Sequence, residues 1–102
     1  MTISSDSAGV EIVENLRALD EGRVRVLLGD VKAGLETLRR ALAVALERND
    51  RGAQFYAHYF LAEAYDKAGD AERARIERDA ARYFVQFVDE DGPETRAARG
   101  DA

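Results

Sequence analysis

The chain has 102 residues, of which 46% are hydrophobic and 34% are charged, so its length suffices for one small domain with a single core. Its 20 acidic and 15 basic residues give a net charge of −5, which argues against binding to duplex nucleic acid or to an anionic membrane surface. It contains no cysteine, which excludes disulfides, thiolate metal sites and cysteine nucleophiles and is typical of a cytoplasmic location.

The first eight residues are mostly small or polar, and they show neither the basic start nor the apolar stretch of a signal peptide. We expect residues 1–8 to form a flexible lead. Because no apolar run in the sequence is long enough to span a bilayer, we expect no membrane partner.

From Val10 onward, apolar residues recur at three- and four-residue steps, which is the spacing that lines one side of an α-helix. This pattern predicts a helix over residues 9–28. Gly22 lies inside it and marks a point where the helix could bend, because glycine is a poor helix former. Gly29 and Asp30 follow, and they suit the left-handed end of one helix and the N-cap of the next. The sequence therefore predicts a tight helix–helix turn there.

Similar patterns predict three more helices, over residues 31–47, 53–68 and 71–88. Gly92-Pro93 ends the periodic region, so we expect residues 89–102 to form a disordered tail. No segment shows the sustained two-residue alternation of a β-strand. The predicted fold class is therefore all-α, with about four helices arranged as antiparallel hairpins.

The second half of the chain resembles a known helical repeat. The Gly-Asp pairs at Gly29 and Gly69 lie 40 residues apart, and residues 57–81 match the spacing of the tetratricopeptide repeat. The matching residues are Leu61, Ala62, Ala64, Tyr65, Gly69, Asp70, Ala74 and Ala81. The long helix and Asn-Asp turn before them are similar to the roughly forty-residue repeats of bacterial regulatory proteins. The first half resembles the family only in its second helix, so helix 9–28 is either a repeat helix or a cap.

This resemblance implies a short stack of hairpins whose first helices line a concave groove for a peptide or helix of a partner protein. When the groove positions of the family are transferred to this sequence by alignment, they fall on Tyr56, Tyr59, Glu63, Asp66 and Lys67. They are aromatic and mostly acidic, which favours a basic or apolar partner segment. Alternatively, Tyr56 and Tyr59 pack against the first helix.

The chain offers little catalytic chemistry. Serine occurs only at positions 4, 5 and 7, the single histidine is His58 without a metal-ligating neighbour one turn away, and the glycines stand singly. We therefore predict no catalytic residues, no metal, no cofactor and no enzymatic activity, and we expect a non-enzymatic adaptor or regulator. The alternative is a small-molecule-binding or catalytic bundle with Tyr59, Glu63, Asp66 and His58 around a pocket.

A second candidate surface lies on helix 71–88, where apolar residues form an outer line besides the one suited to the core. This association stripe consists of Ile76, Ala80, Tyr83, Phe84 and Phe87. We expect it to form a homodimer or to dock on a partner helix. Alternatively, the first helix or the tail folds over it.

Overall fold

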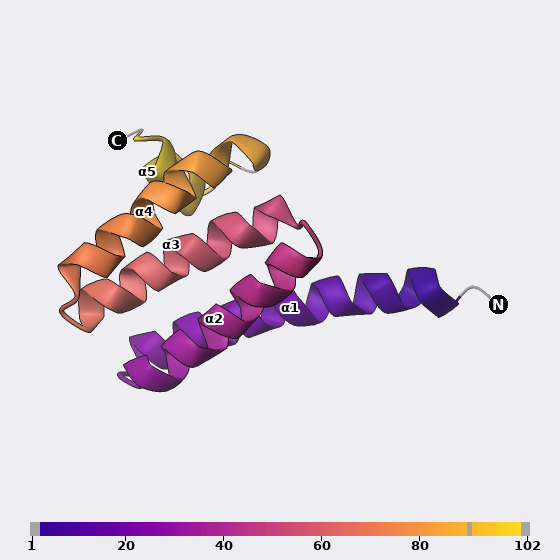
Figure 1. The fold of residues 1–102 in the computed structure, drawn as a ribbon, viewed down its shortest axis with the longest axis horizontal. Helices are drawn as coiled ribbons and strands as arrows, with labels where there is room; N and C mark the ends of the chain where they lie inside the picture. The colour runs from indigo at the N-terminus through magenta and orange to yellow at the C-terminus, as the bar shows by residue number, and fades with distance from the viewer. Residues whose placement is uncertain (1–2, 90, 101–102) are drawn as a thin grey trace.

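The computed structural model describes residues 3–89 and 91–100, with side chains from Val13 onward. Its helices are α1 (Ile3–Leu27), α2 (Val31–Glu47), α3 (Arg51–Lys67), α4 (Ala71–Phe84), the 3₁₀ segment η1 (Val85–Phe87) and α5 (Pro93–Arg99), shown in Figure 1. No strand occurs in these described residues, and the predicted all-α fold is confirmed.

Three turns with the same backbone and capping structure separate the first four helices. In each turn a residue with positive φ is followed by an aspartate whose side chain accepts a hydrogen bond from the backbone N–H three residues later. The N–H of each aspartate also reaches back to a carbonyl of the preceding helix, which satisfies one of its free acceptors. These turns, spaced twenty residues apart, are Gly29-Asp30, Asn49-Asp50 and Gly69-Asp70.

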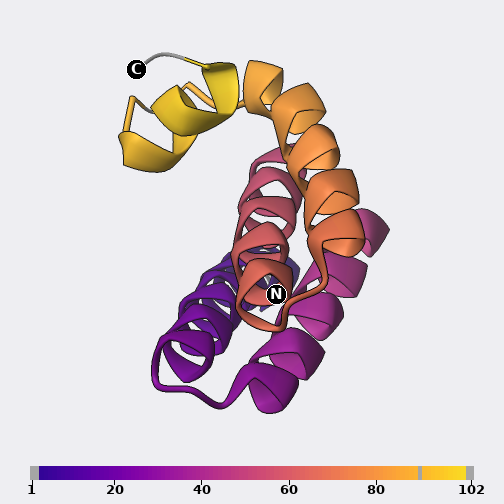
Figure 2. The ribbon, with the colours of Figure 1, turned by 90° about the vertical axis from the view of Figure 1, so that its left-hand side faces the viewer.

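The helices stack as antiparallel pairs, α1 with α2 and α3 with α4 (Figure 1). Figure 2 shows α1, α3 and α5 on one side of the molecule and α2 and α4 on the other. Helix α3 occupies the centre and contacts α1, α2 and α4. We call the side formed by α1, α3 and α5 the concave face.

The larger hydrophobic cluster joins α1, α2 and α3, with Leu38 and Leu61 almost completely buried at its centre. Gly22 of α1 and Gly34 of α2 face each other within it, and a Cβ atom on Gly34 would lie 2.8 Å from the carbonyl oxygen of Gly22. Helix α1 runs through Gly22 without interruption. Gly22 therefore allows close approach of two backbones rather than a break in the helix.

A smaller cluster lies where α3, α4 and α5 meet. Phe55 is fully buried at its centre, and Val85, Val88 and Ala98 pack around it. The guanidinium of Arg99 donates a hydrogen bond to the carbonyl oxygen of Val88 at 3.0 Å. Helix α5 is thus attached to the end of the α3–α4 pair by apolar contact and by a hydrogen bond.

The two ends of the chain differ from the prediction. Within the predicted flexible lead, residues 1 and 2 lie outside the described part, but residues 3–8 belong to α1. The predicted helix over 71–88 ends at Phe84 and tightens into η1.

The disordered tail predicted for residues 89–102 is wrong where the structure describes it, because Pro93–Arg99 form α5. Pro93 suits the first helical position, and the Gly92 N–H donates to the Thr95 hydroxyl at 2.9 Å. Thr95 and Ala98 are buried, so packing against the preceding helices supports this short helix. Residues 90, 101 and 102 lie outside the described part.

Because α1 and α2 approach closely at Gly34, we can predict how a methyl group added there changes the stability of the fold. We expect Gly34→Ala to lower the free energy of unfolding by about 1–3 kcal/mol, because the new Cβ meets backbone atoms that cannot move aside singly. Gly52→Ala is the matched control: its Cβ would meet only the Asp50 carboxylate, at 3.7 Å. Urea unfolding followed by circular dichroism measures both, and equal stability of the two variants would contradict the packing role of Gly34.

Candidate functional site

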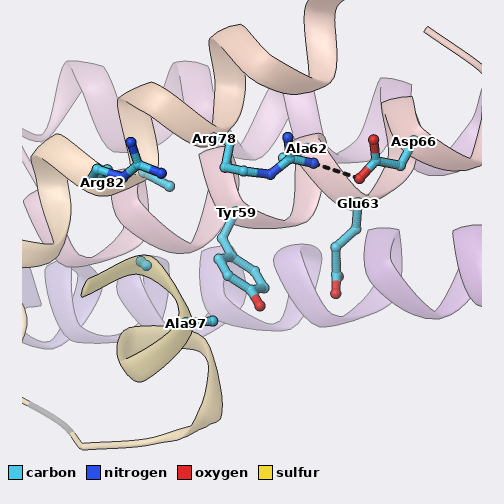
Figure 3. Close-up of a pocket in the computed structure, with 9 residues that line it drawn as sticks. Tyr59, Ala62, Glu63, Asp66, Arg78, Arg82 and Ala97 are labelled. Carbon is cyan, nitrogen blue, oxygen red and sulfur yellow. Dashed lines mark hydrogen bonds and ion pairs between the residues drawn. The ribbon is translucent and has the colours of Figure 1, made fainter. Parts of the chain in front are cut away.

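Three of the predicted groove residues project from α3 towards one hollow on the concave face. Tyr59, Glu63 and Asp66 follow one another at four- and three-residue steps, so they lie on the same side of the helix. This hollow, which we call the first hollow, has a volume of about 320 Å³ and lies between α3, α4 and α5 (Figure 3). Four alanines contribute to its lining, and its polar rim consists of Tyr59, Glu63, Asp66, Arg78 and Arg82.

A second hollow, of about 240 Å³, adjoins the first on the α1 side. Lys67, another predicted groove residue, lines it together with Phe60 of α3 and three residues of α1, which are Arg23, Val26 and Leu27. Glu63 and Asp66 line both hollows. The two hollows therefore form neighbouring parts of one surface, with these carboxylates between them.

Tyr56, the fifth predicted groove residue, lines neither hollow. It is half-buried and packs against both hydrophobic clusters, with its ring centroid 4.9 Å from that of Phe55 and 6.0 Å from that of Phe60. The structure therefore places Tyr56 against the core and outside both hollows, and it brings the other four predicted residues together at the concave face.

Arginines from two other helices pair with the groove carboxylates. Arg78 of α4 lies 2.6 Å from Asp66, as Figure 3 shows, and the Nε atom of Arg23 in α1 lies 3.3 Å from Glu63. Arg23 also lies 3.9 Å from Glu94 of α5 and stands 4.8 Å above the ring of Phe60. The groove is consequently a mixed-charge surface, less acidic than the sequence of α3 alone indicates.

The phenol of Tyr59 is affected by these surroundings. Partial burial raises its pKa above the ordinary value of 10.0, and the negative charges of Glu63 and Glu94 raise it further, while Arg23 and Arg78 act in the opposite direction. Tyr59 therefore presents a neutral hydroxyl to the first hollow at physiological pH, which can both donate and accept a hydrogen bond.

His58 points away from this groove. Its Nδ1 atom lies 2.7 Å from the Glu77 carboxylate, and its ring stacks on Phe84 with centroids 5.5 Å apart. Successive residues of a helix diverge by about 100°, which separates His58 from Tyr59. The structure thus does not assemble the pocket of Tyr59, Glu63, Asp66 and His58 that the alternative interpretation requires.

The predicted association stripe on α4 is open in part. Ile76 and Tyr83 are 54% and 59% exposed, and Phe87 is 36% exposed beneath the guanidinium of Arg51, 4.4 Å from its ring. Ala80 and Phe84 are half-buried. Phe84 packs against the smaller cluster, to which α5 contributes Ala98, whereas Ile76, Tyr83 and Phe87 stay exposed. Association through this stripe stays a prediction.

Sequence reasoning missed Arg23, Glu94 and the α5 wall of the groove. Arg23 reaches Glu63 across two helices, and spacing within one helix gives no signal for such a pair. For α5, the available signal was Pro93 at a helix start with Thr95 two residues later.

Among the described residues, no group of three or more histidine, cysteine or acidic side chains is arranged to hold a metal ion. No helix in this part of the chain combines the length and apolarity needed to cross a membrane. Comparison with protein-family models, curated proteins and solved structures finds no match to the chain. The concave groove therefore has to be interpreted from its own residues.

The environment of Tyr59 gives a test of the groove geometry. We expect Tyr59 to ionise above pH 10, and Glu63→Gln to lower its pKa by removing a nearby negative charge. Near-ultraviolet phenolate absorbance measured against pH reports this ionisation, and Tyr59→Phe identifies the step that belongs to Tyr59. Glu36→Gln, on α2, is the matched control and should leave that step unchanged.

The same shift affects stability at high pH. Because the folded protein favours the neutral phenol more than the unfolded chain does, Tyr59 contributes stability that is present below pH 10 and lost as the pH rises through its folded pKa. The decrease in the free energy of unfolding at high pH should therefore be smaller in Tyr59→Phe. Ionisation of Tyr59 at or below pH 10 would contradict the described packing.

Proposed function

We propose that this protein is a non-enzymatic interaction module that binds a peptide or helix of a partner protein along its concave face. The observation that carries the proposal is the pair of adjoining hollows that share Glu63 and Asp66 and extend from α1 to α5. Their apolar floors and charged rims match the composition of surfaces that recognise protein segments. An adaptor or regulatory role in the cytoplasm fits this binding mode, and the absence of cysteine supports that location.

The shape of the first hollow favours apolar side chains of the partner. Ala62, Ala81, Ala97 and Ala98 contribute only methyl groups to its lining, and this leaves room between the α3–α4 pair and α5. The second hollow has larger apolar groups, including Phe60 and Leu27. A partner segment with apolar residues spaced to reach both hollows would bury these surfaces from water.

The carboxylates between the hollows favour a basic residue in the middle of that segment. The Glu63 and Asp66 side chains are 38% and 54% exposed although each pairs with an arginine. An ionised carboxylate has about four acceptor positions, so each retains capacity for a further donor. The expectation from the sequence, a basic or apolar partner segment, is therefore kept in this proposal.

The resemblance to tetratricopeptide repeats supports the same interpretation, because that family binds protein segments along the first helices of its hairpins. We propose that α1 and α3 have this role here. The lack of an assembled catalytic pocket around His58 favours binding over catalysis.

Filling the first hollow tests the proposal. Ala97 is exposed on α5 at its rim, so Ala97→Trp should occupy the space without disturbing the core and should weaken partner binding by about tenfold or more. Ala43→Trp places the same bulk on an exposed position of α2 and is the matched control. Quantitative affinity purification with the three proteins identifies the partner, and titration with the purified partner measures the dissociation constants.

Partner recovery that is unchanged by Ala97→Trp, or equally reduced by both tryptophan variants, would contradict recognition through the groove. Native mass spectrometry of the freshly purified protein adds an independent readout. A stoichiometric small molecule that disappears in Ala97→Trp would replace the proposal with the small-molecule alternative.

A further inference from the structure

The outer side of α1 carries an apolar surface against which no other described helix packs. Val13, Leu16, Val24 and Leu27 are 49%, 43%, 50% and 59% exposed. The other side of α1 faces the bundle, with Leu19 and Val26 buried in the larger cluster. Helix α1 is also the outermost helix of the stack, and its N-terminal end extends beyond α2 (Figure 1). Exposed apolar stripes of this kind mark interaction surfaces.

Two opposite charges lie in the middle of this stripe. Arg17 and Asp20 are both exposed, and neither forms an ion pair with another residue in the described part of the protein. At about 100° per residue, Val13, Arg17, Asp20 and Val24 fall within about 60° of one another on the helix surface. They therefore present a single face with apolar ends and a charged centre.

The order of these four residues determines which partner fits. Read from either end, the spacing is four, three and four residues, with valine at both outer positions and opposite charges at the inner ones. An identical helix in antiparallel orientation would set each arginine against an aspartate and each valine against a valine. A parallel orientation would instead set like charges against each other, which is unfavourable.

We propose that two copies of this chain associate through α1 as an antiparallel, two-fold symmetric pair. The symmetry axis passes between residues 18 and 19, so Val13 packs on Val24 of the second copy and Arg17 pairs with Asp20 of the second copy. Leu16 and Leu27 extend the apolar contact along one edge. Each surface contact occurs twice, as a closed two-fold interface requires. This assembly goes beyond the proposed groove function, because of the residues named here only Leu27 also lines the second hollow.

The charge pattern favours this surface over the association stripe on α4 as the dimer interface. The stripe contains Ile76, Tyr83 and Phe87 but no charged pair that would select a second copy or set its orientation. The stripe is accordingly the competing interface in the experiment below.

Charge reversal tests the pairing. We expect sedimentation equilibrium of the full chain to show a monomer–dimer equilibrium, and Asp20→Arg or Arg17→Asp alone to raise the dimer dissociation constant by about tenfold or more, because like charges then face each other. The double variant Arg17→Asp with Asp20→Arg restores opposite charges and should restore dimerisation. Glu36→Arg on the exposed side of α2 is the matched charge control, and circular dichroism confirms that each variant is folded.

Cross-linking tests the orientation, and the absence of cysteine from the chain makes it simple. Val13→Cys and Val24→Cys proteins, mixed and oxidised, should form mainly the mixed disulfide between the two variants. Within one chain these positions are about 16 Å apart along the helix axis, which is too far for an internal bridge.

Three results would overturn the proposal. These are a wild-type protein that stays monomeric at every concentration, a dimer that tolerates Asp20→Arg but is lost in Ile76→Glu, and a Val13→Cys protein that cross-links chiefly to itself.

Discussion

Helix α3 is covered by its neighbours over most of its surface, and this burial determines what the rest of the molecule can present. Helices α1, α2 and α4 pack around it, and α5 covers part of its N-terminal half through Phe55. Nine of its seventeen residues are buried, from Ala53 to Tyr65. Tyr59, Glu63, Asp66 and Lys67 stay partly or fully exposed on this helix, and each of them lines one or both hollows. The groove is thus a part of α3 that stays accessible between the other described helices.

The ion pairs across the groove connect helices that are distant in sequence. Arg23 joins α1 to Glu63 of α3 and approaches Glu94 of α5, and Arg78 joins α4 to Asp66. Exposed pairs of this kind contribute little to stability because water and salt screen them. Their effect is to hold long side chains in a defined arrangement around the hollows, which would lower the ordering cost of the proposed partner binding.

The sequence predicted those features that depend on local pattern. Hydrophobic periodicity gave the all-α fold, and the Gly-Asp pairs indicated turns at Gly29 and Gly69. Tyr59, Glu63 and Asp66 could be grouped because they follow one another at helical spacing on one helix. Features that depend on tertiary contact were missed. Helix α5 has only seven residues, too few for a periodic pattern, and it is supported by Ala98 against Phe55. The environment of Arg23 depends on how three helices pack, which no spacing within α1 records.

The twenty-residue interval between the three capped turns has a consequence for the length of such a protein. Each turn is stabilised by its own backbone and aspartate hydrogen bonds, so its structure does not depend on which helix follows it. A forty-residue helix pair inserted at Gly69 would begin and end with the same turn. The added pair could lengthen the concave face while α5 still closed the final pair. This architecture could thus gain or lose concave surface in whole helix pairs without a change in its turns.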